Sequence, residues 1–344
     1  MRRGGSVPDH RRLATAALRG LAAVVALVVA LVAAGSVRPA RAAEPATCAV
    51  GAFILAVYGF DYAANSFDAD FWVWSDCRAG QADPLDTLEY VNADTVTTRI
   101  QTSDAVDGEV WSGRKVTGTF RHVWDLRSFP FDKPTLRIEL ESGESDVTEF
   151  RFTPDSAATG YDPGMTIPGW RVTGFRFGEG TATYPTTFGD PRLAPGSPSA
   201  FSRLTLAMDL ARTELSTFFQ LTAVVYAAFI LCMLTYALHL DRSIALGIQL
   251  GLLGGALFAT AINLGTARNA LGHQNGLTLV DLIHIAVLLY IIGAAAIAIG
   301  SRVALERGRD LRQVARVNHA AGVLAVVSFV LLNLALILRA ARVG

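Results

Sequence analysis

The sequence predicts an all-β, immunoglobulin-like sandwich followed by a bundle of four membrane-spanning helices. Between residues 43 and 213, short apolar-polar runs recur between turn residues, and no long helical period occurs. Between residues 214 and 344, four apolar segments each approach the roughly 20 residues that a bilayer requires. The chain has 344 residues, which is long enough for one domain of each kind.

Composition argues against several other classes of protein. The chain is 51% hydrophobic with a net charge of zero, so it shows no basic surface for nucleic acid. Its three cysteines form no CxxC pair and no His/Cys cluster, so we expect no metal and no cofactor. We also find no Ser/His/Asp constellation and no phosphate-binding loop, and we therefore do not expect an enzyme.

Residues 1–42 resemble a secretory signal peptide. Five arginines precede or enter an apolar run from Leu21 to Ala34, which is too short to span a bilayer comfortably. Ala40-Arg41-Ala42 fits a small-residue cleavage site. An uncleaved anchor helix is the alternative. In both cases we expect residues 43–213 outside the cytoplasm and the protein in the plasma membrane.

The exported domain contains eight candidate strands between Gly, Pro, Asp and Ser turns. They are Val50–Phe60, Phe67–Ser75, Asp94–Gln101, Arg114–Trp124, Thr135–Leu140, Glu149–Phe152, Trp170–Phe177 and Arg203–Leu210. The first two are predicted to form a hairpin, which Cys48 and Cys77 flank almost symmetrically. Antiparallel pairing places these cysteines opposite each other, and in an oxidising compartment we expect a disulfide.

The predicted spans occupy the second part of the chain, residues 214–344. They are Thr217–Leu238, Ile244–Leu264, Leu279–Gly300 and Ala320–Leu338. Five arginines lie between the third and fourth spans: Arg302, Arg307, Arg309, Arg312 and Arg316. Because cytoplasmic loops carry an excess of basic residues, this connection is expected in the cytoplasm.

A loop with two aromatic residues follows the fourth candidate strand. Its sequence is Phe129-Pro130-Phe131-Asp132, and the prolines at 130 and 134 cannot donate to a sheet ladder. Two exposed aromatic rings require an apolar surface to pack on, and the membrane helices provide one. An ordinary hairpin corner with a chance FPFD sequence is the alternative.

This loop, the β-rich domain and the four spans together resemble the Cys-loop superfamily of pentameric ligand-gated ion channels. The resemblance covers Cys48 to Arg339. The two cysteines of the family's loop would fall at His122 and Leu136, so the chain is similar to the prokaryotic branch, which lacks them. The resemblance implies a homopentamer in a lipid bilayer, a small-molecule or proton agonist, and permeating ions.

In the family, the FPFD loop presses on the membrane domain near an arginine surrounded by carboxylates. The resemblance therefore implies that Asp61, Phe129, Pro130, Phe131, Asp132 and Arg212 couple the two domains. An arginine at this position is costly unless it is paired. The alternative is a snorkelling Arg212 with two solvated aspartates.

The second span has two different faces at 100° per residue. Gly247, Gly251, Gly254, Gly255 and Phe258 form a small face, and polar residues share the opposite face. Because polar groups in a membrane usually face water or a bundle interior, we predict that the second face lines a pore. Its residues are Asp241, Ala245, Gln249, Leu252, Ala256, Ala259 and Asn263.

Two of these predicted pore residues have particular roles. Leu252 would form a hydrophobic constriction, and Asp241 would favour cations at the cytoplasmic mouth. Alternatively, the span is a buried helix of a non-conducting bundle, in which Gln249 and Asn263 bond to other helices. The protein would then be a membrane-anchored ligand sensor of the same fold.

The resemblance implies a ligand site between subunits, beneath the loop that joins the last two strands. The candidate residues are Trp72, Trp74, Glu144, Asp146, Tyr184 and Phe188. The segment after Leu140 is expected to be a loop, and it carries no aromatic residue for an amine cage. His284 in the third span either senses protons or makes structural hydrogen bonds.

The chain also departs from the family. Its first span contains no proline, and Gly265–Gly276, which joins the second and third spans, is longer than usual and proline-free.

Overall fold

The computed structural model describes residues 23–29, 44–238, 245–272 and 276–344. Pro45–Gly344 is one compact unit, and Met1–Glu44 is another. Residues 23–29 are helical, and the rest of the predicted signal peptide lies outside the described residues.

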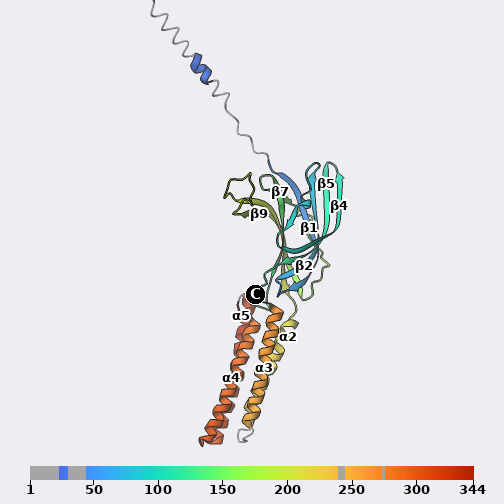
Figure 1. Ribbon diagram of the computed structural model, residues 1–344. Coiled ribbons are helices and arrows are strands. Elements are labelled where there is room, and N and C mark those ends of the chain that lie inside the picture. The colour runs from blue at the N-terminus through green and yellow to red at the C-terminus, as the bar shows by residue number, and fades with distance from the viewer. Residues whose placement is uncertain (1–22, 30–43, 239–244, 273–275) are drawn as a thin grey trace, which may run out of the picture. The chain divides into compact units, whose positions relative to one another are not determined.

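The β-rich part of Pro45–Gly344 consists of two sheets (Figure 1). In the first sheet the strand order is β4-β5-β2-β1-β7, and β8 also pairs with β1. The strands are β1 (Ala46–Asp61), β2 (Ser66–Arg78), β4 (Ala93–Val106), β5 (Glu109–Arg121), β7 (Phe150–Pro154) and β8 (Gly160–Tyr161). The predicted sandwich is confirmed as two packed sheets.

The second sheet contains the strands that lead toward the membrane helices. Its order is β3-β6-β10-β9, with β10 between β6 and β9. The strands are β3 (Leu88–Tyr90), β6 (Thr135–Asp146), β9 (Trp170–Tyr184) and β10 (Ser199–Arg212). All eight candidate strands have a counterpart, whereas the short strands β3 and β8 were not predicted.

One predicted loop is wrong. The segment after Leu140 continues β6 as far as Asp146, because β10 begins early enough to pair with it, with Phe201 opposite Asp146. A strand with an available neighbour extends even through Ser and Gly, since each added residue satisfies backbone hydrogen-bonding groups. Two carboxylates of the predicted ligand site, Glu144 and Asp146, therefore lie on a strand end.

The hairpin of β1 and β2 follows the predicted alternation. Phe71 and Val73 are fully buried, whereas Trp72 and Trp74 are half-buried on the other face. Ala49 pairs with Asp76, which places Cys48 opposite Cys77. The predicted disulfide is present, with 4.6 Å between the two Cα atoms.

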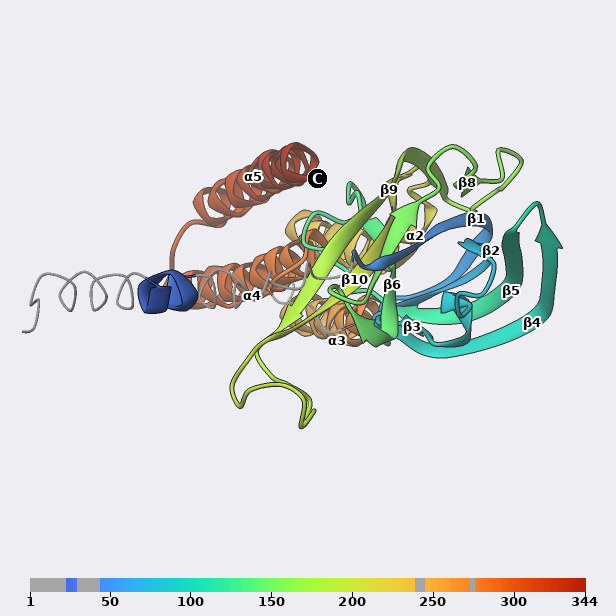
Figure 2. The same ribbon diagram turned by 90° about the horizontal axis from the view of Figure 1, so that it is seen from above.

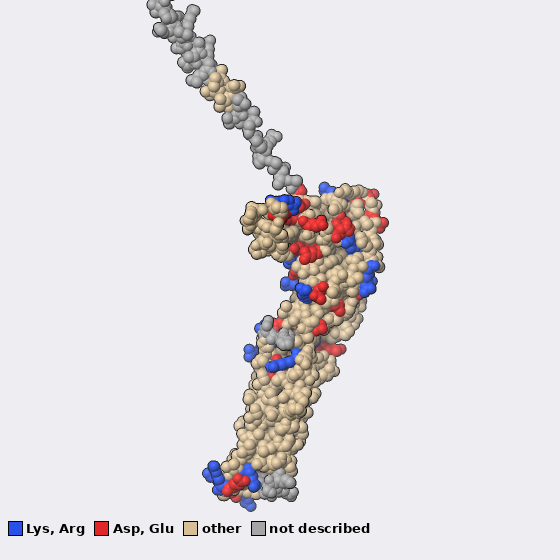
Figure 3. All heavy atoms as spheres, in the orientation of Figure 1, with Lys and Arg blue, Asp and Glu red and all other residues tan. Residues whose placement is uncertain are grey.

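The second part of this unit contains four long helices, and each is apolar enough to cross a membrane. They are α2 (Ser216–Leu234), α3 (Ala245–Leu271), α4 (Leu279–Glu306) and α5 (Leu311–Val343), and the short helix η2 (Thr235–Ala237) continues α2. The visible surface over these helices is almost free of charge until the far tip, where basic and acidic residues lie together (Figure 3). The chain is therefore a multi-pass membrane protein with a β-rich N-terminal domain.

The helices extend beyond the predicted spans. α3 continues past Gly265 to Leu271, because this segment contains no proline and buries Ala267 and Leu271. The start of α4 is as the sequence suggests, because Thr278 and Asp281 form a reciprocal capping box. The connection between the second and third spans is therefore shorter than predicted.

Aromatic and polar contacts hold α5 to the other helices. Phe229 of α2 stacks on Phe329 with 3.7 Å between ring centroids, and the ring of Tyr290 in α4 packs edge-on against both. Asn318 donates a hydrogen bond to the carbonyl oxygen of Tyr236, which joins α5 to η2. α5 therefore lies against both α2 and α4, and Figure 2 shows it beside α4.

Candidate functional site

Among the described residues, the most completely buried ion pair lies where the β-domain meets α2. Arg212 ends β10, and Asp132 ends the FPFD loop. The guanidinium Nε and Nη2 atoms lie 3.1 and 3.0 Å from the two carboxylate oxygens of Asp132. The side chains are only 8% and 4% exposed, so this bidentate pair is shielded from water. The predicted pairing of Arg212 with Asp132 is present.

Aromatic rings complete the environment of Arg212. Its guanidinium carbon lies 4.1 Å from the ring centroid of Trp170 and 4.7 Å from that of Phe129. The Tyr62 hydroxyl lies 3.2 Å from Nη2. Burial alone would lower the pKa of Arg212, but the hydrogen bonds and charge of Asp132 outweigh it and raise that pKa. The cation is therefore stable in this site.

The prediction that Asp61 also pairs with Arg212 is wrong for this conformation. The Asp61 carboxylate accepts hydrogen bonds from the backbone N–H groups of Ala63 and Ala64. It thus closes the turn between β1 and β2, as aspartates commonly do. The neighbouring residue, Tyr62, provides the contact with Arg212 from this turn. Sequence could not distinguish these two adjacent polar residues.

The FPFD loop packs on the first membrane helix, as its aromatic residues suggested. Phe129 is fully buried, and its ring centroid lies 6.3 Å from that of Phe218 in α2. Pro130 is also buried, and Phe131 is half-buried. The loop therefore joins the β-domain to α2 through apolar packing as well as through the ion pair.

The β1–β2 turn meets the end of α3. A Cβ atom added at Gly272 would overlap the carbonyl oxygen of Tyr62, and φ of Gly272 is +69°. Only glycine fits both this close approach and this backbone conformation. The turn that carries Tyr62 and Asp61 thus contacts the pore-helix candidate directly.

α3 is rotated relative to the predicted pore face. Gln249 and Ala256 are each only 2% exposed, because this face packs on α2 and α4. Gln249 donates a hydrogen bond to the carbonyl oxygen of Thr235, and Asn263 contacts His284 of α4 at 3.1 Å. Gln249 and Ala256 thus face the subunit's own helices, contrary to the prediction that they line a pore, whereas Asn263 is half-buried and its place at the pore stays a prediction. His284 also contacts the carbonyl oxygen of Val280, as a structural histidine does.

The other predicted pore residues are either half-buried or outside the described part of the chain. Leu252 and Ala259 are half-buried at the edge of the packed face. Asp241 and the side chain of Ala245 lie outside the described residues.

The small-residue face of α3 is exposed, and large side chains such as Ile248 and Ile262 are exposed beside it. It comprises Gly247, Gly251, Gly254, Phe258, Ala261 and Gly265, at helical spacings of four and three. A Cβ added at any of these glycines would meet no atom within 4 Å. Phe258 is 70% exposed and is the largest side chain of this face. Phe258 is thus the one bulky side chain on a face that otherwise consists of glycine and alanine.

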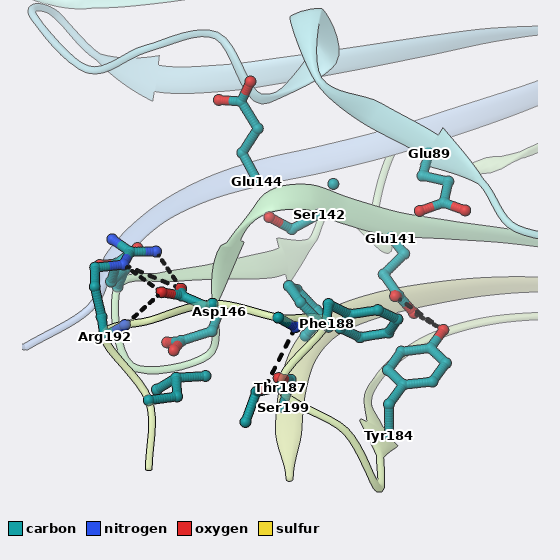
Figure 4. A pocket seen from close by; sticks show the side chains of 16 residues that line it. Glu89, Glu141, Ser142, Glu144, Asp146, Tyr184, Thr187, Phe188, Arg192 and Ser199 are labelled. Atoms are coloured by element: carbon teal, nitrogen blue, oxygen red, sulfur yellow. Dashed lines mark hydrogen bonds and ion pairs between the residues drawn. The ribbon is translucent and has the colours of Figure 1, made fainter. Parts of the chain in front are cut away.

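A cavity of about 530 Å³ lies in the β-domain, and Figure 4 shows the side chains that line it. The ends of β6 and of the β9–β10 hairpin form it. Six carboxylates line it: Glu89, Glu141, Glu144, Asp146, Glu149 and Asp190. Arg192 is the one arginine in the lining, and it already pairs with Asp190 at 2.7 Å. The pocket therefore favours a cation.

Aromatic rings and a buried polar cluster form one wall of this pocket. The ring centroids of Tyr184 and Phe188 are 5.3 Å apart, and Phe201 lies about 6 Å from both. The Tyr184 hydroxyl donates to Glu141 at 3.0 Å and accepts from Arg203 at 2.8 Å. Burial and the Glu141 hydrogen bond raise the pKa of Tyr184, so the phenol stays protonated.

Four of the six predicted ligand residues meet in this pocket: Glu144, Asp146, Tyr184 and Phe188. Trp72 and Trp74 do not line it. The indole N–H of Trp74 donates to Asp155 at 3.0 Å, and its ring covers Gly51. The predicted site lies between subunits, so a single chain leaves the roles of Trp72 and Trp74 in it untested.

The sequence matches no protein-family model and no curated protein.

Several residues of these sites were missed by sequence reasoning. Tyr62 and Trp170 surround Arg212, and Glu141 and Arg203 support Tyr184. One signal was available, because Arg203 pairs with Glu141 across the β6–β10 ladder and opposite charges at paired positions attract. Trp170 lies opposite Arg212 in the β9–β10 ladder, but it carries no opposite charge that would have marked it as a partner.

Proposed function

We propose that the chain is the subunit of a homopentameric ligand-gated ion channel. The observation that carries this proposal is that β6 and β10 are paired and connect the acidic pocket to the junction. Asp146 and Ser199 lie at their pocket ends, whereas Thr135 and Arg212 lie at their membrane ends. A ligand that moves the β9–β10 hairpin therefore acts on a strand that continues into α2.

The pocket supports an organic cation as the agonist. An excess of carboxylates attracts positive charge, and the exposed ring of Phe188 beside Tyr184 offers an aromatic face. Tetramethylammonium is a suitable probe because it carries charge without hydrogen-bond donors. Protons are the other agonist class, and a change of bath pH tests them separately.

We propose that the free face of α3, in place of the predicted face, lines the pore. In five copies, its glycines would leave a wide passage and Phe258 would form a ring of aromatic side chains. Apolar rings close channels by excluding water, since they cannot replace the hydration of an ion. Asp241 precedes α3 in the sequence and stays the predicted source of a preference for cations, which the reversal potential of Asp241→Asn in a salt gradient tests.

Single-channel recording of the purified full chain in planar bilayers tests the function. We expect current on addition of tetramethylammonium or on mild acidification. Phe258→Ser should wet the ring and raise the basal open probability. Leu257→Ser is the matched control, because Leu257 lies at the same depth but about 100° around the helix. Equal effects of both variants would contradict the proposed pore face.

One observation favours a second candidate, a membrane-anchored ligand sensor that conducts no ions. Gln249 and Asn263 are satisfied inside the subunit, as in the non-conducting bundle. If Phe258→Ser passes no current in confirmed pentamers while tetramethylammonium still raises the melting temperature, the sensor is the better description.

A further inference from the structure

His284 lies inside the helix bundle with a hydrogen-bonding group at each of its two ring nitrogens. The side chain is fully buried near the start of α4. Its Nδ1 atom lies 2.8 Å from the carbonyl oxygen of Val280, one turn earlier on the same helix. Its Nε2 atom lies 3.1 Å from Oδ1 of Asn263 on α3. The ring therefore links two neighbouring membrane helices.

The number of protons on the ring decides which atom of Asn263 can face it. The carbonyl oxygen of Val280 only accepts, so Nδ1 must carry a proton to bond to it. In the neutral ring, Nε2 then carries no proton and bonds only to the amide nitrogen of Asn263. In the imidazolium, Nε2 donates and bonds to the amide oxygen, which is the atom that faces it in this structure.

The Asn263 side chain carries this difference toward the surface of α3. Asn263 is half-buried, and among the described residues no group bonds to its amide nitrogen, which is not enclosed either. The oxygen and nitrogen of an amide point in different directions, and half a turn about the Cβ–Cγ bond exchanges them. The half-exposed side of α3 therefore presents a carbonyl oxygen when His284 is neutral and an N–H donor when it is protonated.

The charged groups around His284 balance each other. Asp281 lies three residues earlier on α4, and its carboxylate is 3.1 Å from Nε of Arg268 on α3. α2 carries no charged residue, and its Tyr226 and Cys232 contact groups on α5 and α4. The arginines at this end of α5 are exposed. The proton on His284 is therefore the local change in charge to which Asn263 responds.

We propose that His284 and Asn263 form a proton-operated switch between α4 and α3. A proton taken up from solution by His284 turns the amide of Asn263 and exchanges a carbonyl oxygen for an N–H donor on the half-exposed side of α3. Rings of carbonyl oxygens favour cations, so in the proposed channel this exchange weakens the preference for cations. That consequence rests on the proposed function, whereas the switch itself does not.

NMR of the purified full chain in detergent, with isotope-labelled histidine, tests the switch. Nitrogen chemical shifts distinguish the imidazolium from the two neutral tautomers, and His284→Gln identifies the signals of His284. Above the titration we expect the neutral ring to carry its proton on Nδ1, and on acidification both nitrogens should become protonated. A neutral ring protonated on Nε2, or one that takes up no proton between about pH 8 and about pH 4, would overturn the proposal.

Substitutions of Asn263 test its part in the switch. Asn263→Asp offers only acceptors, so the His284 signals should change at a pH about one unit higher, or more. Asn263→Leu offers no partner, and the change should occur at a lower pH than in wild type, because a charged donor loses more than a neutral acceptor. Asn269→Asp places the same charge on an exposed position of α3 and should have little effect. Equal shifts in the two aspartate variants would contradict the switch.

Bilayer recordings test the consequence for permeation. The cation-to-anion permeability ratio, obtained from reversal potentials, should decrease on acidification in wild type and stay constant in His284→Gln. A ratio that is independent of pH in wild type would contradict a role of the switch in permeation. If no variant passes current, the proposed channel fails, and the NMR signals alone decide whether the switch exists.

Discussion

Arg212 illustrates how a single buried charge can join two domains. A cation removed from water is costly unless its partners replace the lost hydration. Asp132 provides the opposite charge, Tyr62 a hydroxyl, and Trp170 and Phe129 provide ring faces. These four partners come from three parts of the β-domain, namely the FPFD loop, the β1–β2 turn and the start of β9. Any change in their mutual positions therefore changes the environment of Arg212.

Removing one member of this pair should be strongly destabilising. Arg212→Ala leaves Asp132 buried without a partner, and we expect a loss of about 3 kcal/mol or more in the free energy of unfolding. A double-mutant cycle with Asp132→Ala, followed by thermal unfolding in detergent, should give a coupling energy of about 2 kcal/mol. The same cycle with Asp61→Ala should give less than about 0.5 kcal/mol. Strong coupling to Asp61 would contradict the observed pairing.

The buried side chain of His122 should make the stability of the protein depend on pH. Burial, with a smaller contribution from the positive charge of Arg137, lowers the pKa of His122 to about 4. Between about pH 6.5, the ordinary pKa of histidine, and about pH 4, the unfolded chain therefore binds more protons than the folded chain. The free energy of unfolding is therefore unaffected by His122 above about pH 6.5. It decreases as the pH falls toward 4, by at most about 3 kcal/mol.

The melting temperature of wild type and His122→Phe across this pH range tests the dependence. Phenylalanine keeps an aromatic ring against Phe67 and Trp124, so the variant should fold. Its melting temperature should decrease less on acidification. Parallel pH profiles of the two proteins would show that another group is responsible.

At the scale of elements, α3 has a polar stripe and a glycine stripe, and only one of them can face the subunit's own helices. The polar stripe does so, because Thr235 and His284 provide hydrogen-bonding partners. Inside a bilayer, a neighbouring carbonyl group satisfies an amide as water would. The glycine stripe is left free.

Gln249 distinguishes the two orientations of α3. Gln249→Leu removes the hydrogen bond to Thr235 and should lower the stability of the solubilised protein by about 1 kcal/mol. Conductance and selectivity should stay unchanged, because the side chain faces α2. A changed conductance with unaltered melting temperature would restore Gln249 to the pore. Ile248→Ala, on the adjacent exposed position, controls for general effects of truncation.

At the scale of the whole molecule, the free faces of the chain suggest an assembly. The glycine face of α3 is exposed and packs on none of the described helices of its own subunit, so it can face a common axis. Closed rings are the usual result when identical subunits contact each other head to tail.

Native mass spectrometry in detergent should therefore show a pentamer. Gly251→Leu and Gly254→Leu place bulk on the free face and should reduce the conductance of this pentamer, while Leu250→Ala, beside that face, should have little effect. A stable monomer or dimer would contradict the proposed channel. If the pentamer is intact but neither glycine substitution changes its conductance, only the proposal that this face lines the pore would be contradicted.

Sequence patterns that depend on local geometry were predicted well. Alternation along β1 and β2, the opposed cysteines and the capping box at Thr278 need only the period of a strand or helix. The FPFD loop and Arg212 were identified as partners from a resemblance and a physical cost, and they are in contact. The apolar lengths of the four helices were likewise readable from composition.

The sequence alone thus determined the order of elements, the membrane spans, the disulfide and the pairing of Arg212 with Asp132. Only the tertiary structure decided which face of α3 is buried, that Tyr62 replaces Asp61, and that Glu141 and Arg203 support Tyr184. The physical reason is that periodicity defines faces but not their partners. A polar side chain is equally well satisfied by water or by a neighbouring helix, and the packing of the whole chain selects between them.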